Sequence, residues 1–204
     1  VRQTDKGLFV RPGNRSVYSI HDHSVVVRVT TRDGVVGWGE GWAIVAPEVA
    51  ATILRDLLAP FVIGRDPQDA VAIYEDLYDA MRVRGFFGGF YLDAIAALDI
   101  AIWDCKARAV NLPICKLLGA QRHTRIPAYV SGLPRPHLTE RAELAREWSE
   151  RGFTAVKFAA AVASEGEIRE IEAIRKAAGD DLRILCDFHW RYNAGEAIRL
   201  ISAM

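Results

Sequence analysis

The sequence lacks any excess of one charge and any long apolar run, and each absence excludes a class of protein. Lysine plus arginine number 26 and aspartate plus glutamate also number 26, so neither a basic surface for nucleic acid nor an acidic disordered tail is expected. No segment approaches the roughly 18 consecutive apolar residues of a membrane span, and the N-terminus does not have the pattern of an export signal. We therefore expect no nucleic-acid partner and no membrane partner.

Cysteine is also scarce. The three cysteines, Cys105, Cys115 and Cys186, are an odd number and show no C-x-x-C spacing. This usage favours reduced thiols over a disulfide framework and argues against a structural zinc site. The expected location is therefore the cytoplasm.

The composition that remains is that of an ordinary globular protein, with 50% hydrophobic and 25% charged residues in 204. Asp33-Gly34 separates two apolar segments, residues 24–32 and 35–40, and this pattern predicts a β-hairpin. Residues 7–19 contain glycine, proline and asparagine, so we predict a mobile loop there that could act as a lid.

Three helices are predicted to follow the hairpin. Asp66 and Pro67 are the residue types favoured at an N-cap and at the first helical position. The helices are expected at residues 47–58, 67–83 and 91–109, and the last carries an apolar stripe of Ala94, Ile95, Leu98, Ala101, Ile102 and Cys105. The hairpin and these helices predict an α+β unit of ordinary domain size.

Strands and helices alternate after Gly119, which predicts parallel βα units. The expected strands are residues 126–131, 154–160 and 183–189, and the expected helices are residues 138–151, 167–178 and a segment from residue 194 onward. Three such units are about three-eighths of an eight-unit barrel, and three strands cannot close one. We therefore expect either a fragment truncated within a barrel or another element that covers the sheet edges.

The most informative segment is the predicted strand 183–189, which ends in Asp187-Phe-His189. Because side chains alternate along a strand, Asp187 and His189 are expected on one face, where a metal ligand and a proton donor could share a pocket. The carboxyl end of a strand is also where an α/β barrel places its active site. The alternative is that Asp187 caps the next helix and His189 fills a packing gap.

Three motifs resemble those of a known enzyme group. Residues 94–108 read AIAALDIAIWDCKAR, residues 111–119 read NLPICKLLG, and residues 34–40 read GVVGWGE. These motifs and their spacing resemble the mandelate racemase/muconate lactonizing group of the enolase superfamily. The resemblance implies an N-terminal α+β capping domain, residues 1–118, followed in residues 119–204 by the first three βα units of a (β/α)8 TIM-type barrel.

The resemblance also implies a reaction. Such enzymes bind Mg²⁺ and remove a proton next to a carboxylate; that proton is so weakly acidic that a divalent cation and a well-placed base are both needed. By resemblance, Asp187 is the first of three carboxylate ligands to Mg²⁺, and hard oxygen ligands suit this ion. The other two ligands and the base are expected on later strands, outside this sequence.

The second predicted strand separates subgroups of the family. Racemases carry Lys-x-Lys there, whereas this chain has Lys157 followed two residues later by Ala159, so the usual lysine base is missing. Asp187-x-His189-x-Arg191 resembles the acid-sugar dehydratases of the galactonate and mannonate type, in which the histidine protonates the departing hydroxyl. Lys157 is then expected to polarise the substrate carboxylate; alternatively it extends past the strand end into solvent.

The expected reaction is therefore loss of water from a hexonate or pentonate to give a 2-keto-3-deoxy acid. By the same resemblance, the expected partner is a small carboxylate substrate bound through Arg191, Trp42, Arg15 and Asn14, and we expect a homo-oligomer. The alternatives are that Arg191 only orients its loop and that the segment around Asn14 and Arg15 is a basic surface loop.

Three other functions remain open. A racemase or cycloisomerase of the same superfamily would use Asp187 equally well. A retro-aldol enzyme could form a Schiff base on Lys157, but that would leave the Asp187-x-His189 motif unexplained. Finally, the chain as given could be a non-catalytic fragment that needs the rest of a barrel.

Overall fold

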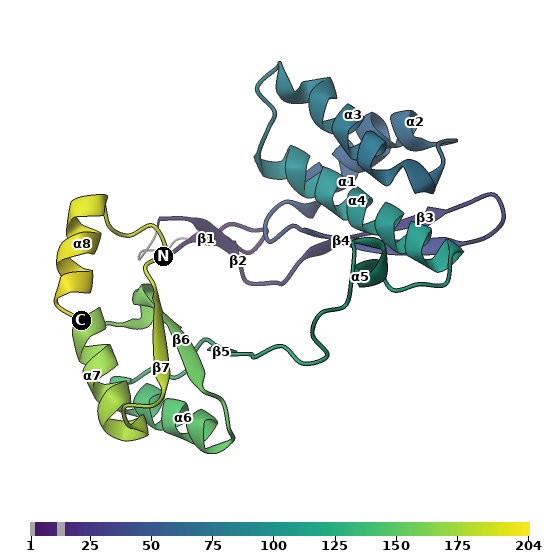
Figure 1. Ribbon diagram of the computed structural model, residues 1–204. Coiled ribbons are helices and arrows are strands. Elements are labelled where there is room, and N and C mark those ends of the chain that lie inside the picture. Colours follow the sequence, from purple (N-terminus) through teal and green to yellow (C-terminus); the bar gives the residue numbers. More distant parts are fainter. Residues whose placement is uncertain (1–2, 12–14) are drawn as a thin grey trace. The chain divides into compact units, whose positions relative to one another are not determined.

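The computed structural model describes residues 3–11 and 15–204 and is drawn in Figure 1. It contains two compact units. The first consists of Val17–Arg122 with the described residues up to Val10, and the second consists of His123–Met204 with the short segment around Arg11 and Ser16.

The first unit begins with two short strands, β1 (Leu8–Val10) and β2 (Val17–Ser19), which pair in antiparallel fashion. The prediction of a loop over residues 7–19 is therefore wrong for these two segments. Phe9 lies opposite Tyr18 in the register, and their rings stack with centroids 6.1 Å apart. A cross-strand aromatic pair of this kind stabilises two paired strands. The loop prediction rested on the composition of residues 7–19 and did not take this pairing into account.

The predicted β-hairpin is confirmed as β3 (Ser24–Thr30) and β4 (Val36–Trp42), with Thr30 opposite Val36 and Ser24 opposite Trp42. Strand β4 continues to Trp42, two residues beyond the predicted segment 35–40. Among the described strands β3 pairs only with β4, and residues of β3 help to line a groove of about 1050 Å³.

The predicted helices of the first unit are confirmed, with small differences at their ends. Helix α1 (Pro47–Thr52) runs through a π-helical segment, η1 (Ile53–Leu58), into α2 (Ala59–Val62). The Asp66 side chain accepts a hydrogen bond from the Gln68 N–H at 2.8 Å, as an N-cap should. The remaining elements are η2 (Pro67–Asp69), α3 (Ala70–Arg82), α4 (Gly89–Ala109) and α5 (Ile114–Leu117).

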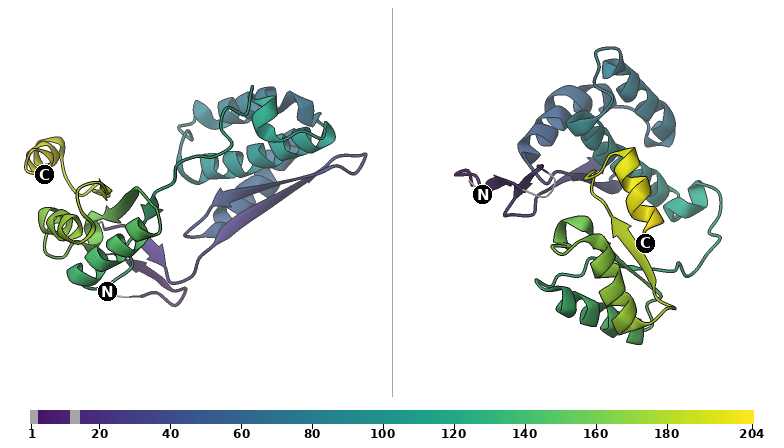
Figure 2. Two further views of the ribbon diagram at one scale, coloured as in Figure 1. Left: turned by 60° about the horizontal axis from the view of Figure 1, so that its bottom comes forward. Right: turned by 90° about the vertical axis from the view of Figure 1, so that its left-hand side faces the viewer.

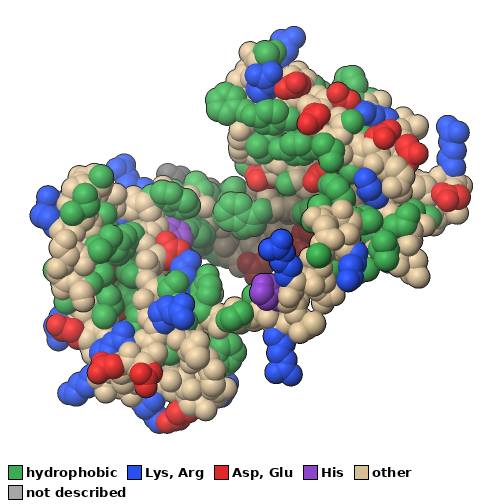
Figure 3. All heavy atoms as spheres, viewed as in Figure 1, with side chains coloured by type: hydrophobic (Ala, Val, Ile, Leu, Met, Phe, Trp, Pro, Cys, Tyr) green, Lys and Arg blue, Asp and Glu red, His purple; other side chains and the backbone are tan. Residues whose placement is uncertain are grey.

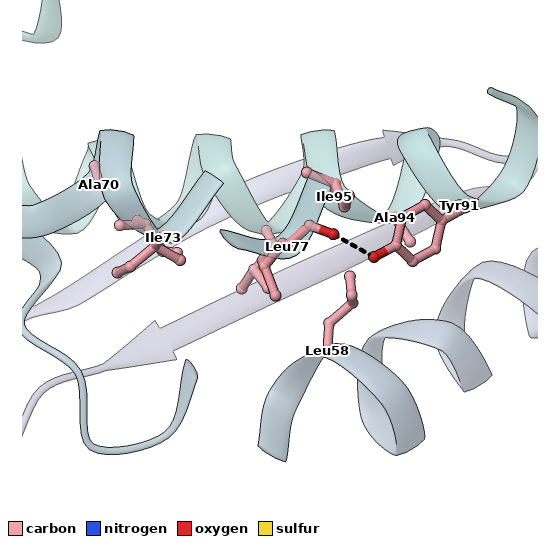
Figure 4. Packing of buried hydrophobic residues seen from close by; sticks show 9 residues of the cluster. Leu58, Ala70, Ile73, Leu77, Tyr91, Ala94 and Ile95 are labelled. Atoms are coloured by element: carbon pink, nitrogen blue, oxygen red, sulfur yellow. Dashed lines mark hydrogen bonds between the residues drawn. The ribbon is translucent and has the colours of Figure 1, made fainter. Parts of the chain in front are cut away.

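The core of the first unit lies between α3, α4 and the η1 segment, as Figure 4 shows. The Tyr91 hydroxyl donates a hydrogen bond to the Leu77 carbonyl oxygen, so the buried phenol has a partner. The buried members of this core are Leu58, Ala70, Ile73, Leu77, Tyr91, Ala94, Ile95, Leu98 and Ile102. The predicted apolar stripe of α4 is wholly buried.

Helix α4 packs along β4 unusually closely, and Figures 1 and 2 show the helix lying along the hairpin. Gly37, Gly39 and Gly41 alternate along β4 and turn the same face to the helix. A Cβ atom on Gly39 would lie 2.0 Å from the Ala97 carbonyl oxygen. The GVVGWGE motif is therefore a packing motif in which glycine lets two backbones approach.

The second unit contains a parallel three-stranded sheet of order β5-β6-β7. Its elements are β5 (Val130–Ser131), α6 (Leu138–Glu150), β6 (Ala155–Ala159), η3 (Ala160–Val162), α7 (Glu167–Ala178), β7 (Arg183–Asp187) and α8 (Ala194–Ser202). The predicted strand 126–131 is reduced to its last two residues, and the predicted strand 183–189 ends two residues early.

Acidic and basic side chains are interspersed over the surface that Figure 3 shows. Within the described part of the chain, none of the helices combines the length and the apolar character needed to cross a bilayer.

Candidate active site

Lys157 and Asp187 meet at the carboxyl ends of β6 and β7. The register places Lys157 opposite Leu185 and Ala159 opposite Asp187, so these residues lie on one face of the sheet. The Lys157 ammonium is 2.8 Å from Asp187 Oδ2. Ala159, where racemases of the group carry their second lysine, leaves the position opposite Asp187 without a second ammonium.

Lys157 and Asp187 each stabilise the charged form of the other. The hydrogen bond from Lys157 is the largest contribution that lowers the pKa of Asp187, and the backbone N–H of His189 lowers this pKa further. The same hydrogen bond raises the pKa of Lys157. At neutral pH, Asp187 is therefore a carboxylate and Lys157 an ammonium.

His189 reaches Asp187 by a different route from the one predicted. Because β7 ends at Asp187, the alternation of strand side chains does not extend to His189, and the expected strand geometry is wrong. Instead His189 adopts a left-handed backbone conformation with φ of 52°, and its N–H donates to Asp187 Oδ1 at 2.9 Å. This Asx-type turn brings His189 Nδ1 to 3.8 Å from the same oxygen. Carboxylate and imidazole are thus adjacent.

The alternative role of Asp187 as a helix cap is excluded. Helix α8 is capped by Asn193, which accepts a hydrogen bond from the Glu196 N–H, while the Glu196 side chain accepts one from the Asn193 N–H. Asp187 instead faces Lys157 and the His189 turn.

Arg191 is held by the scaffold of its own unit. Its Nη1 lies 3.1 Å from the Ala160 carbonyl oxygen and 3.3 Å from Glu167 Oε1. The side chain remains 43% exposed, so the guanidinium also borders solvent. Its predicted contact with substrate stays a prediction, and its observed contacts orient the loop.

The other predicted substrate-binding residues lie apart from this cluster in the sequence. Trp42 ends β4 in the first unit and is 69% exposed. Arg15 is exposed and left-handed, with φ of 56°, and its N–H donates to the Arg11 carbonyl oxygen. Asn14 lies outside the described residues. Substrate binding by these three side chains remains a prediction.

Sequence reasoning missed Glu167 and Tyr192, which lie next to the candidate site. Glu167 Oε1 accepts a hydrogen bond from the Tyr192 hydroxyl at 2.6 Å and is almost completely buried. A signal was available: Glu167 and Glu170 lie seven and four residues before Ile174, on the apolar face of a helix whose other acidic residue, Glu172, is exposed.

A magnesium ligand set can be tested against these residues. Asp187 is ionised, partly exposed and supplies hard carboxylate oxygens, so its chemistry fits Mg²⁺. No cluster of three or more His, Cys, Asp or Glu side chains that could hold a metal occurs in residues 3–11 and 15–204. Asp187 therefore fits as one ligand, and the described residues do not supply a complete set around it.

Comparison with known proteins decides the family. Residues 1–119 match the model of the mandelate racemase/muconate lactonizing enzyme N-terminal domain, and residues 140–204 match the enolase C-terminal domain-like model. The chain belongs to the mandelate racemase/muconate lactonizing enzyme family. The predicted resemblance is thus confirmed, and the two units are a capping domain and part of a barrel of the enolase superfamily fold.

Individual members of the family differ in the reaction they are named for. The chain is 34% identical to the D-galactarolactone cycloisomerase of Agrobacterium fabrum, over 86% of this chain and 47% of that protein. It is also 34% identical to the D-gluconate dehydratase of Thermoproteus tenax, over 87% and 38% respectively. A solved enolase superfamily member from Agrobacterium tumefaciens is 50% identical, with a TM-score of 0.96 over 100% of this chain and 52% of its own. The chain spans about half the length of the curated relatives it matches.

Proposed function

We propose that the complete protein is a hydro-lyase that removes water from a hexonate or pentonate to give a 2-keto-3-deoxy acid. The observation that carries this proposal is the Lys157, Asp187 and His189 cluster with Ala159 opposite Asp187. It combines a carboxylate that suits a metal with a nearby imidazole and omits the second lysine. Relatives named D-gluconate dehydratase and D-galactonate dehydratase support the same reaction.

Asp187 is proposed as one ligand to Mg²⁺. When bound, the cation would supply positive charge next to the substrate carboxylate, which makes the neighbouring carbon acid easier to ionise. The contribution of this chain is to keep Asp187 deprotonated, because the Lys157 and His189 hydrogen bonds lower the pKa of its carboxyl group. The remaining ligands and the base are proposed to come from strands that these 204 residues do not include.

Lys157 is proposed to bind the substrate carboxylate as a cation. Its side chain is 29% exposed and its ammonium lies beside Asp187 near the strand end, within reach of an anion. Its raised pKa argues against the Schiff-base alternative, because a protonated amine cannot attack a carbonyl.

His189 is proposed as the general acid. The base removes the proton α to the carboxylate, the β-hydroxyl leaves as its C–O bond breaks, and His189 donates the proton that converts it to water. The enol that remains tautomerises to the 2-keto acid, so atoms and charge balance. His189 Nδ1 lies 3.8 Å from Asp187 Oδ1, which places the ring next to the proposed metal ligand.

The rest of the substrate site is proposed from the sequence. Arg15, Asn14 and Trp42 would contact the polyol from the capping domain, residues 1–118, and Arg191 from the barrel. Residues 119–204 would supply the first three of eight βα units. We further propose that the active protein is a homo-oligomer.

A product screen tests the proposal. The complete protein with Mg²⁺ should convert at least one member of an acid-sugar library to a product that forms a semicarbazone. Removal of Mg²⁺ with EDTA should abolish this signal, and re-addition should restore it. A complete, metal-loaded protein that produces no 2-keto-3-deoxy acid from any hexonate or pentonate would refute the hydro-lyase assignment.

A second candidate is a cycloisomerase, which the 34% identity to D-galactarolactone cycloisomerase favours. The two reactions differ in mass balance, since dehydration lowers the mass of the product by one water and cycloisomerisation leaves it unchanged. Mass spectrometry of the product from each lactone and each open-chain acid therefore distinguishes them.

A further inference from the structure

The turn after β7 has an unfavourable backbone conformation, which surrounding contacts must stabilise. His189 and Trp190 are consecutive left-handed residues, with φ of 52° and 55°, and neither is glycine. Residues with a Cβ atom avoid this region, and two in succession are rarer still. Such a conformation persists where surrounding contacts determine it, typically at functional sites.

Two local hydrogen bonds define the start of the turn. The His189 N–H donates to Asp187 Oδ1 at 2.9 Å, and the Arg191 N–H donates to the Phe188 carbonyl oxygen at 3.0 Å. Both lie within the segment, so they shape the turn but do not anchor it to the rest of the unit.

The anchor lies at the exit of the turn and comes from α7. Glu167 Oε1 accepts a hydrogen bond from the Tyr192 hydroxyl at 2.6 Å and another from Arg191 Nη1 at 3.3 Å. Burial, followed by the hydrogen bond to Glu167, raises the pKa of the Tyr192 phenol, which therefore remains a donor. Arg191 Nη1 also donates to the Ala160 carbonyl oxygen just after β6.

The burial of Glu167 needs these partners. The Glu167 side chain is only 6% exposed, and a buried carboxylate is costly unless it is paired and hydrogen-bonded. An acidic residue in the first turn of a helix interacts favourably with the helix dipole even when it is exposed. The dipole alone therefore does not explain why Glu167 is buried. Its partners, Arg191 and Tyr192, directly follow the two left-handed residues.

We propose that Glu167 is a positioning residue that anchors the turn of residues 188–192 through Arg191 and Tyr192 and so keeps His189 beside Asp187. This inference rests on the proposed function in one respect, namely that His189 is the acid. Arg191 thus orients the turn through its scaffold contacts, in addition to the substrate contact proposed above.

The test uses the complete protein and two variants with matched controls. Tyr192→Phe removes one hydrogen bond and almost no volume, and Glu167→Ala removes the anchor. Tyr74→Phe and Glu172→Ala make the same chemical changes at exposed helix positions away from the turn. Hydrogen exchange of the peptide that covers residues 188–193 is measured by mass spectrometry, and kcat and KM are measured on the acid sugar that the wild type dehydrates.

Tyr192→Phe and, more strongly, Glu167→Ala should speed exchange in residues 188–193, whereas both controls should match the wild type. Because a displacement of about 1 Å can cost a rate factor of about 100, kcat should fall between about tenfold and about 100-fold while KM changes little. Unchanged exchange in both variants would overturn the anchor, even if the protein dehydrates no acid sugar. Faster exchange with unchanged kcat would overturn the positioning of His189.

Discussion

At the scale of single residues, the second unit depends on a buried ion pair. Arg141 in α6 and Glu170 in α7 are 1% and 0% exposed, and two guanidinium nitrogens each lie 2.7 Å from a carboxylate oxygen. Arg141 Nη1 also donates to the carbonyl oxygens of Arg135 and Pro136 in the loop after β5. The pair therefore holds α6, α7 and the loop after β5 together.

Loss of either charge should be costly. Glu170→Gln leaves the Arg141 charge buried without its counterion, so the free energy of unfolding should fall by about 3–5 kcal/mol in a urea titration. Glu172→Gln, an exposed change on the same helix, should alter it by less than about 0.5 kcal/mol. Equal stabilities of the two variants would show that the pair is not important for folding.

The sequence predicts which side chains lie together better than it predicts the backbone that brings them together. Because strands and helices alternate in this unit, functional polar side chains are expected near the carboxyl ends of the strands. Asp187 and Lys157 lie there. The left-handed turn at His189 and Trp190 carries no glycine to signal it, and it depends on Glu167, which is distant in sequence. Hence the strand was predicted to run two residues too far.

At the scale of secondary-structure elements, the contact between α4 and β4 organises the first unit. Gly37 and Gly39 have no space for a Cβ atom, because backbone atoms of α4 occupy it. A backbone, unlike a flexible side chain, cannot move aside cheaply. A single added methyl group at Gly37 or Gly39 should therefore disturb this contact.

Gly39→Ala should destabilise the first unit by about 1–3 kcal/mol or more, as overpacking does. Gly88→Ala provides the control, because Gly88 has extended backbone with φ of −166° and no atom within 4 Å of an added Cβ. Thermal unfolding followed by circular dichroism measures both. A Gly39→Ala protein as stable as the control would contradict the close approach of helix and strand.

Strongly periodic elements were predicted well and short strands poorly. Helix α7 has the predicted bounds, because its apolar residues recur at helical spacing. Strands β1 and β2 have three residues each, and β5 has two. Segments this short cannot show the alternating pattern that identifies a strand. Their pairing depends on partners that are not adjacent in sequence.

At the scale of the whole molecule, each of the three sheets has unpaired edges among the described strands, and the chain spans about half the length of its curated relatives. Exposed sheet edges favour association with other chains. The described residues contain no cluster of three or more His, Cys, Asp or Glu side chains that could hold a metal ion, so the proposed magnesium site needs ligands besides Asp187.

The 204-residue chain expressed alone should therefore be inactive, whereas the complete protein should dehydrate its acid sugar. The two are compared in the semicarbazide assay at equal concentration with excess Mg²⁺. Dehydration by the 204 residues alone would show that the ligands and the base assigned to later strands are not needed.

The central claim is that His189 delivers the proton to the leaving hydroxyl, and His189→Asn in the complete protein tests it most directly. Asparagine tolerates a left-handed backbone and keeps the N–H that donates to Asp187, so the turn should persist. The rate of 2-keto-3-deoxy acid formation should fall by about 100-fold to about 10,000-fold, while Mg²⁺ affinity measured by calorimetry stays unchanged. Dehydration at the wild-type rate would contradict the account.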